Sequence, residues 1–195
     1  MNQQTLDLIG RRHTVEQTVD AFYLARDLGF DNINMDLIVG LPGEEYAQVE
    51  HTMQEIKKLD PDSITVHSLA VKRAARLRLF KEEHKEMTMT NNAQIMDMTS
   101  SYAKAADLYP YYLYRQKNMA GNFENVGYAR EGKAGIYNIL IMEELQSILA
   151  LGAGASTKMV WDKDRIERIE NVKDIKSYIE RIDEMIERKR AGLHE

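Results

Sequence analysis

The sequence of 195 residues contains no cysteine, three prolines and a single tryptophan. Without cysteine the chain cannot form disulfides, thiol nucleophiles, or zinc and iron–sulfur sites built on thiolates. Long hydrophobic runs are also missing, because no apolar stretch approaches the ~20 residues that cross a bilayer. The polar start at residues 1–4 lacks the order of a signal peptide. We therefore expect a cytoplasmic protein with no membrane partner.

Charge of one sign does not dominate either, since 26 Lys and Arg residues stand against 31 Asp and Glu residues, for a net charge of −5. This balance gives no reason to expect nucleic acid as a partner. Hydrophobic residues make up 44% and charged residues 29%, as in ordinary folded proteins. A basic cluster between Lys72 and Lys81 is interpreted as a solvated helix face, and a site for substrate carboxylates is the alternative.

The first 70 residues alternate predicted helices with apolar strands. Thr14 and Gln17 form a capping-box pattern and Gly29 suits a helix C-terminus, which predicts a helix between them. A second helix is expected at about 44–59, and strands are expected at 32–39 and 63–69. The first strand is apolar except at Asn34 and Asp36, so we expect it to be buried on both faces. The alternation is typical of a parallel α/β sheet or barrel.

The rest of the chain is less regular. We expect a helix from about residue 90 to 108, a β-rich string at 111–114 and a long irregular loop at 116–135. A short strand at 147–151 leads into a glycine loop, followed by a strand at about 165–169 and a helix at about 172–190. No repeat or low-complexity linker divides the chain. We therefore expect one domain over residues 1–195.

Asp36 is the most informative residue for function, because a carboxylate within an apolar strand needs a polar partner. It could accept hydrogen bonds from a ligand's hydroxyl or ammonium groups, or it could be a structural acid. Arg11 and Arg12 precede a helix, where a guanidinium can bind a carboxylate, although such residues are commonly surface charges. His67 faces a ligand or lies in the core. The five histidines have no regular spacing, so no metal ligand is assigned.

Two further groups of residues are ambiguous by themselves. The glycine loop at 152–155 would let the backbone approach an adenosine or a phosphate, or it is an ordinary tight turn. Tyrosines could line a cavity for a flat aromatic ligand, although aromatic residues in strands more often belong to the core. These tyrosines are Tyr109, Tyr111, Tyr112, Tyr114, Tyr128 and Tyr137.

Three motifs together resemble a known family. IGRRHT at residues 9–14, NMDLIVGLPG at 34–43 and LGAGAS at 151–156 are similar, in order and spacing, to oxygen-independent coproporphyrinogen III dehydrogenases. The segments at 111–116 and 125–129 look most like the Z-type branch. The resemblance implies a partial (βα) barrel of the radical S-adenosylmethionine type, of which this chain would be a C-terminal fragment.

The resemblance also implies a cofactor site. Arg11 matches an arginine at the methionyl part of S-adenosylmethionine, and Asp36 matches an aspartate at its ribose or amino acid part. His67 and Ala70 fall beside the adenine, with His67 in place of a family aromatic. Gly152 and Gly154 fall near a second cofactor or the substrate. The family's [4Fe-4S] cluster is held by a CxxxCxxC loop that would precede this chain, so no catalytic residue is assigned here.

The implied function is radical oxidative decarboxylation of porphyrinogen propionates in haem biosynthesis, by an enzyme of which this chain would be an inactive part. The implied partner is a tetrapyrrole precursor. A haem-trafficking relative that binds tetrapyrrole without oxidising it is one alternative, and a regulatory or assembly module is another. Removing the early barrel strands would expose an edge next to residues 32–39. We therefore expect the chain to form a homodimer through that edge or to cover it with its own helices.

Overall fold

The computed structural model describes residues 1–70, 89–115, 120–162 and 165–193. It divides into two compact units, Met1–Gly135 and Ile136–Glu195. The sequence offered no linker or shift in composition at this boundary, so the division was not predicted. No helix among the described residues is both long enough and apolar enough to span a membrane.

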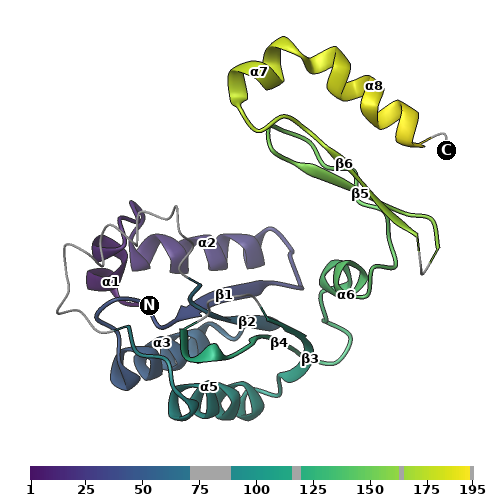
Figure 1. Ribbon diagram of the computed structural model, residues 1–195. Coiled ribbons are helices and arrows are strands. Elements are labelled where there is room, and N and C mark those ends of the chain that lie inside the picture. The colour runs from purple at the N-terminus through teal and green to yellow at the C-terminus, as the bar shows by residue number, and fades with distance from the viewer. Residues whose placement is uncertain (71–88, 116–119, 163–164, 194–195) are drawn as a thin grey trace. The chain divides into compact units, whose positions relative to one another are not determined.

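The first unit is a four-stranded sheet with helices (Figure 1). Strands β1 and β2 run parallel, and β4 pairs antiparallel with both β2 and β3, in the order β1-β2-β4-β3. The elements are α1 (Gln3–Leu8), α2 (Val15–Asp27), β1 (Asn34–Val39), α3 (Tyr46–Leu59), β2 (Ser63–Ser68), α5 (Ala93–Ala105), β3 (Tyr109–Tyr114), the 3-10 turn η1 (Ala120–Asn122) and β4 (Asn125–Ala129). The predicted α/β class and partial barrel are confirmed.

The start of α2 follows the predicted capping pattern. The Thr14 side chain accepts a hydrogen bond from the Gln17 N–H at 3.2 Å, and the Gln17 side chain accepts one from the Thr14 N–H at 2.9 Å. These two bonds satisfy donors that the first turn of a helix otherwise leaves unpaired. Gly29 ends the helix with φ 90°, a conformation that glycine adopts without steric cost.

We expect Thr14→Ala to lower the free energy of unfolding by about 1 kcal/mol, because it removes the cap acceptor. Thr18→Ala, one turn later in the same helix, serves as a control. Its hydroxyl donates to the Thr14 carbonyl at 3.2 Å and caps no N–H, so its effect should be about 0.5 kcal/mol or less. Urea unfolding of both variants measures the difference, and equal losses would contradict the capping role.

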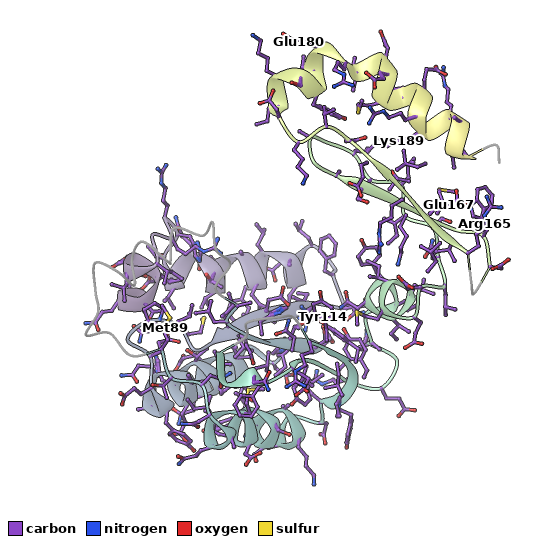
Figure 2. The ribbon with its side chains drawn as sticks, viewed as in Figure 1. Met89, Tyr114, Arg165, Glu167, Glu180 and Lys189 are labelled. Atoms are coloured by element: carbon purple, nitrogen blue, oxygen red, sulfur yellow. The ribbon has the colours of Figure 1, made fainter. Side chains whose placement is uncertain are left out.

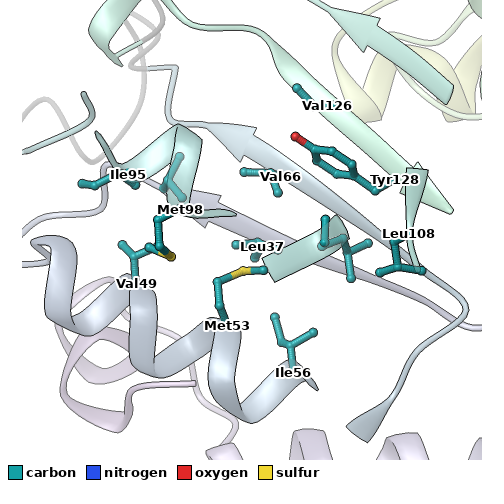
Figure 3. Close-up of a cluster of buried hydrophobic side chains, with 13 residues drawn as sticks. Leu37, Val49, Met53, Ile56, Val66, Ile95, Met98, Leu108, Val126 and Tyr128 are labelled. Atoms are coloured by element: carbon teal, nitrogen blue, oxygen red, sulfur yellow. The ribbon is translucent and has the colours of Figure 1, made fainter. Parts of the chain in front are cut away.

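The hydrophobic core lies between one face of this sheet and the helices α3 and α5 (Figure 3). Leu37, Val66 and Val126 stand on neighbouring strands at one level, because the strand register pairs them in sequence. From the helices come Val49, Met53 and Ile56 of α3 and Ile95, Met98 and Ala103 of α5. The core therefore occupies one face of the sheet, and the opposite face is left for a ligand-binding site.

Two expectations for this unit are wrong. Strand β1 is not buried on both faces: Leu37 and Val39 are buried, but the alternate residues Asn34, Asp36 and Ile38 are exposed. Leu37 and Val39 are buried because they pack with residues of α3 and α5 in the core cluster, to which Asn34, Asp36 and Ile38 do not belong. The segment 116–135 is not wholly irregular, since β4 lies within it as a fully buried strand. Its glycine, which suggested a loop, is part of the pairing with β3.

The second unit is a β-hairpin with helices, made of α6 (Ile136–Met142), β5 (Ser156–Val160), β6 (Ile166–Glu170), α7 (Ile175–Glu180) and α8 (Ile182–Leu193). Met159 of β5 and Met185 of α8 are buried. The Lys189 ammonium of α8 donates to the Asn171 side chain at 2.6 Å, and Arg165 pairs with Glu167 at 2.7 Å; Figure 2 labels Lys189, Arg165 and Glu167. The unit is thus held by a small core and by polar contacts at its edges.

Two further expectations fail here. The predicted strand at 147–151 is only an isolated bridge between Ile148 and Lys158. The single helix expected at 172–190 is two helices that meet at Arg181, which has φ −112° and lies outside helical geometry. Asp174 caps the first of them by accepting from the Ser177 N–H at 2.9 Å.

Candidate cofactor site

A cavity of about 360 Å³ lies beside strand β1 in the first unit. This volume is within the usual range of small-molecule pockets. Both Arg11 and Asp36 line it, so the structure brings together the two charged residues that the resemblance singled out. The remaining lining is mostly apolar or hydroxylic and includes Thr5, Leu6, Ile9, His13, Val15, Thr18, Met35, Ile38, Leu41, Val49, Thr52 and Ile56. Besides Arg11 and Asp36, the lining includes a second acidic residue, Glu44, and the N-terminal residue Met1, so the largely apolar wall carries charged groups of both signs.

The end of helix α1 places Arg11. The Arg11 N–H donates to the Leu6 carbonyl at 2.8 Å and the Gly10 N–H donates to the Asp7 carbonyl at 3.1 Å, which closes the helix in a Schellman-like turn. Gly10 has φ 73°, in the left-handed region where glycine carries no penalty. Arg11 itself is exposed. Its backbone is therefore anchored while its guanidinium remains available to a ligand.

Asp36 stands in the middle of β1 on the face opposite the core, and its side chain is 64% exposed. The Asn34 amide donates to Asp36 Oδ1 at 2.7 Å. The His67 imidazole Nε2 lies 3.7 Å from the same oxygen, a charge contact when His67 is protonated. The sequence placed Asp36 in a strand buried on both faces, which is wrong, but its need for polar partners is met by these neighbours.

The electrostatic surroundings keep Asp36 ionised. The His67 imidazole acts most strongly to lower the pKa of Asp36 below its ordinary value, partial burial opposes this, and Thr65 and Asn34 add to the lowering. Asp36 is therefore an anion at neutral pH with acceptor capacity for a ligand.

His67 and Ala70 lie at the carboxyl end of β2. His67 is partly exposed and contacts Asp36, so it is neither a fully buried core residue nor a lining residue of the cavity. Ala70 is partly buried, two residues after the strand. The adenine contact implied for these two residues stays a prediction.

Gly152 and Gly154 belong to the second unit, in the loop before β5. The Gly152 N–H donates to the Tyr178 hydroxyl at 3.2 Å, and the Gly154 N–H donates to the Val172 carbonyl at 2.8 Å. Both glycines have positive φ, of 102° and 71°. Because both N–H groups are bonded within the unit, a ligand would meet the Cα surface of this loop rather than these two donors.

An iron–sulfur cluster does not fit the residues of this chain, which has no cysteine. Among the described residues no group of three or more His, Asp or Glu side chains is placed to hold a metal ion. The basic cluster between Lys72 and Lys81 lies outside the described residues. The chemistry of Arg11 and Asp36, which both line the cavity, is compatible with S-adenosylmethionine, since a guanidinium suits a carboxylate and a carboxylate suits a ribose diol.

The tyrosines that could have lined an aromatic cavity do not gather at one site, although Tyr109, Tyr111, Tyr112 and Tyr114 all lie on β3. Tyr128 is buried in the core and Tyr137 is exposed in the second unit. Tyr112 lays its ring over Gly127 of β4, which residue patterns alone did not indicate. The signal that could have found it is the pairing of Tyr112 with Gly127, because a glycine leaves room for an aromatic ring on the neighbouring strand.

The chain is similar to several known proteins. Residues 1–56 match the model of the radical SAM superfamily. The chain is 46% identical over 188 residues, 95% of its length, to the oxygen-independent coproporphyrinogen-III oxidase-like protein HemZ of Bacillus subtilis, of which it spans 37%. It is also 39% identical over 66 residues to the heme chaperone HemW of the same organism, matching 34% of this chain and 17% of that relative.

A solved structure shares the fold. The coproporphyrinogen III oxidase HemN of Escherichia coli, described as a radical SAM enzyme, superposes with a TM-score of 0.63 at 19% sequence identity. The match covers 94% of this chain and 41% of that one. At this identity the likeness bears on the fold alone.

Proposed function

Because this chain belongs to the radical S-adenosylmethionine superfamily, in which it resembles oxygen-independent coproporphyrinogen III oxidases, we propose that it supplies half of a cofactor site. Within that site Arg11 binds the carboxylate of S-adenosylmethionine and Asp36 binds the ribose diol. The first unit belongs to the catalytic domain, and the second is its trailing family-specific region. The observation that carries the proposal is the single cavity lined by both residues.

The proposed contacts of Arg11 and Asp36 need different groups on the ligand. A guanidinium binds a carboxylate through two parallel N–H donors, and Arg11 is exposed beside the cavity. A carboxylate accepts from two hydroxyls of a ribose, and the lowered pKa of Asp36 keeps it an acceptor at neutral pH. The apolar wall excludes water from the bound ligand. Together the residues orient the cofactor, which is the protein's main contribution to cofactor chemistry.

The proposed reaction is the oxidative decarboxylation of porphyrinogen propionate side chains in the cytoplasm. When bound and reduced, S-adenosylmethionine supplies a hydrogen-abstracting group for that reaction. The cluster that reduces it cannot be held by this chain, so the chain alone is inactive. The name of the 46% identical relative supports the choice of substrate, and the relatives named heme chaperones support haem trafficking as the second candidate. A homodimer through the β1 edge remains a proposal.

The two candidates are separated by one anaerobic assay on the whole protein, reconstituted with its cluster. With coproporphyrinogen III, S-adenosylmethionine and a reductant, we expect release of CO2 in step with formation of 5′-deoxyadenosine. The Asp36→Asn variant should lose most of both products at subsaturating cofactor. Haem is then added to the same protein in a separate titration: stable stoichiometric binding of haem, together with no CO2 released from coproporphyrinogen III, would replace the proposed reaction by haem trafficking. If the protein neither releases CO2 nor binds haem, both candidate functions are refuted.

A further inference from the structure

Glu44 is a nearly buried acid that lines the cavity beside β1. It is 5% exposed, and it shares the cavity wall with Arg11 and Asp36. Within the described ranges, the Glu44 side chain forms no hydrogen bond and no ion pair. A carboxylate that is withdrawn from water without such a partner is costly. The cavity therefore presents an acid whose charge the described part of the protein leaves unpaired.

A tight turn fixes the place of Glu44. The Glu44 N–H donates to the Leu41 carbonyl at 3.2 Å, which closes a turn directly after β1. Proline at the second position, Pro42, and glycine with φ 74° at the third, Gly43, are typical of a type II turn. Pro42 is fully buried, so the turn is packed against its surroundings. The backbone of Glu44 is therefore held in one position before α3 begins.

The cations of the cavity do not neutralise this acid. Arg11 and the N-terminal ammonium of Met1 line the same cavity, but neither forms an ion pair with Glu44. The Met1 ammonium donates to Thr52 Oγ1 at 2.9 Å and acts on Glu44 only through space. When the chain is part of a longer protein, position 1 has a peptide nitrogen, which carries no charge. A bound ligand is then the source of a positive charge for Glu44.

We propose that Glu44 recognises the positive charge of S-adenosylmethionine, an inference that rests on the proposed function of this cavity. The ligand has a carboxylate, a ribose diol and two cationic centres, the sulfonium and the ammonium. Arg11 matches the carboxylate and Asp36 the diol, and the Glu44 carboxylate matches a cationic centre. On a largely apolar wall such a charge acts more strongly than in water. Glu44 therefore makes the site prefer the charged cofactor over uncharged adenosine compounds.

The test uses the whole protein with its cluster and measures dissociation constants for three ligands. S-adenosylmethionine has both cationic centres, S-adenosylhomocysteine has only the ammonium, and 5′-deoxyadenosine has neither. Glu44→Gln keeps the shape of the side chain and removes its charge. We expect it to weaken S-adenosylmethionine roughly tenfold to a hundredfold and to leave 5′-deoxyadenosine unchanged. A loss confined to S-adenosylmethionine assigns Glu44 to the sulfonium, and a loss shared with S-adenosylhomocysteine assigns it to the ammonium.

Two further variants separate charge from shape. Glu44→Asp keeps the negative charge, so it should retain most of the preference for S-adenosylmethionine over 5′-deoxyadenosine. Glu45→Gln is the matched control, because Glu45 is adjacent and exposed and does not line the cavity. It should change none of the three constants.

Thermal unfolding distinguishes ligand recognition from a structural role of Glu44. Without ligand, Glu44→Gln should not lower the melting temperature, because it removes a buried charge that has no partner. The rise in melting temperature on adding S-adenosylmethionine should be smaller in Glu44→Gln than in wild type. A lower melting temperature of the ligand-free variant, together with equal losses for all three ligands, would overturn the proposal.

Arg11→Ala and Asp36→Asn distinguish this inference from the proposed function. If neither of them weakens any of the three ligands, the proposed cofactor site fails and Glu44 has no cofactor to recognise. If both weaken S-adenosylmethionine while Glu44→Gln binds all three ligands like wild type, the cofactor site stands and the role of Glu44 is refuted.

Discussion

Replacing Asp62 by alanine is expected to lower the free energy of unfolding by about 3 kcal/mol, the largest single loss of stability we predict in the first unit. The Asp62 carboxylate accepts from the Ile33 N–H at 2.9 Å and pairs with Arg26 at 2.7 Å. Its side chain is nearly buried, so water cannot replace either contact. The substitution therefore leaves a backbone donor unpaired just before β1, the strand that carries Asp36.

Lowering the pH should also remove the stabilisation that the Asp62 carboxylate contributes. Burial is the largest influence on Asp62 and would raise its pKa, but the Ile33 N–H and Arg26 outweigh it and lower the pKa below the ordinary value. A lowered pKa means that the stabilisation is complete above the unfolded value of about 3.9 and is lost as pH falls through the folded value. The difference between wild type and Asp62→Ala should therefore be constant near neutral pH and shrink below about pH 4.

Urea unfolding at several pH values measures both effects. The matched control is Asp31→Ala, which removes a carboxylate that pairs with Lys133 at 3.3 Å but is 91% exposed. An exposed pair contributes about 1 kcal/mol at most, so this variant should unfold almost like wild type. If Asp31→Ala and Asp62→Ala cost the same, the buried contacts of Asp62 are not the source of its effect.

The second large effect concerns the cofactor. Arg11→Ala and Asp36→Asn should each weaken S-adenosylmethionine binding to the whole protein roughly tenfold or more, since hydrogen bonds to charged groups contribute about 1.5 to 3 kcal/mol. The two changes should differ with partial ligands. 5′-Deoxyadenosine has the ribose and lacks the carboxylate, and methionine has the carboxylate and lacks the ribose. Asp36→Asn should weaken only the first, and Arg11→Ala only the second.

Calorimetric titration of both partial ligands into the two variants gives this comparison. Arg12→Ala is the matched control, because Arg12 adjoins Arg11 and is likewise exposed, but does not line the cavity. It should bind both ligands like wild type. Loss of methionine binding in Asp36→Asn, without loss of 5′-deoxyadenosine binding, would assign Asp36 to the amino group instead of the ribose.

The sequence predicted those parts of the fold that depend on neighbouring residues. The capping box of Thr14 and Gln17 and the ending at Gly29 are local, so their residue types alone specify them. Strand β4 was missed because a short strand in the middle of a sheet is stabilised by its two partners rather than by its own pattern. Its Asn, Gly and Ala content has little intrinsic strand propensity.

The candidate site was predictable only in part, because its residues are far apart in the sequence. Arg11 and Asp36 could be paired only through the resemblance, since 25 positions separate them and no local pattern relates them. The prediction that Asp36 is buried was wrong, because the apolar sequence of a strand does not reveal that one face of the strand is exposed to solvent. The packing of the Tyr112 ring on Gly127 depends on the register of β3 and β4, which residue types do not specify.

We propose that Arg11 and Asp36 of this chain hold opposite ends of one S-adenosylmethionine molecule. The most direct test is a titration of S-adenosylmethionine into the whole protein and into the Arg11→Ala/Asp36→Asn double variant, reconstituted to the same iron content. Because the two proposed contacts are to separate ends of the ligand, their losses should add to roughly a hundredfold rise in the dissociation constant. A double variant that retains its iron and binds S-adenosylmethionine as tightly as wild type would contradict the account.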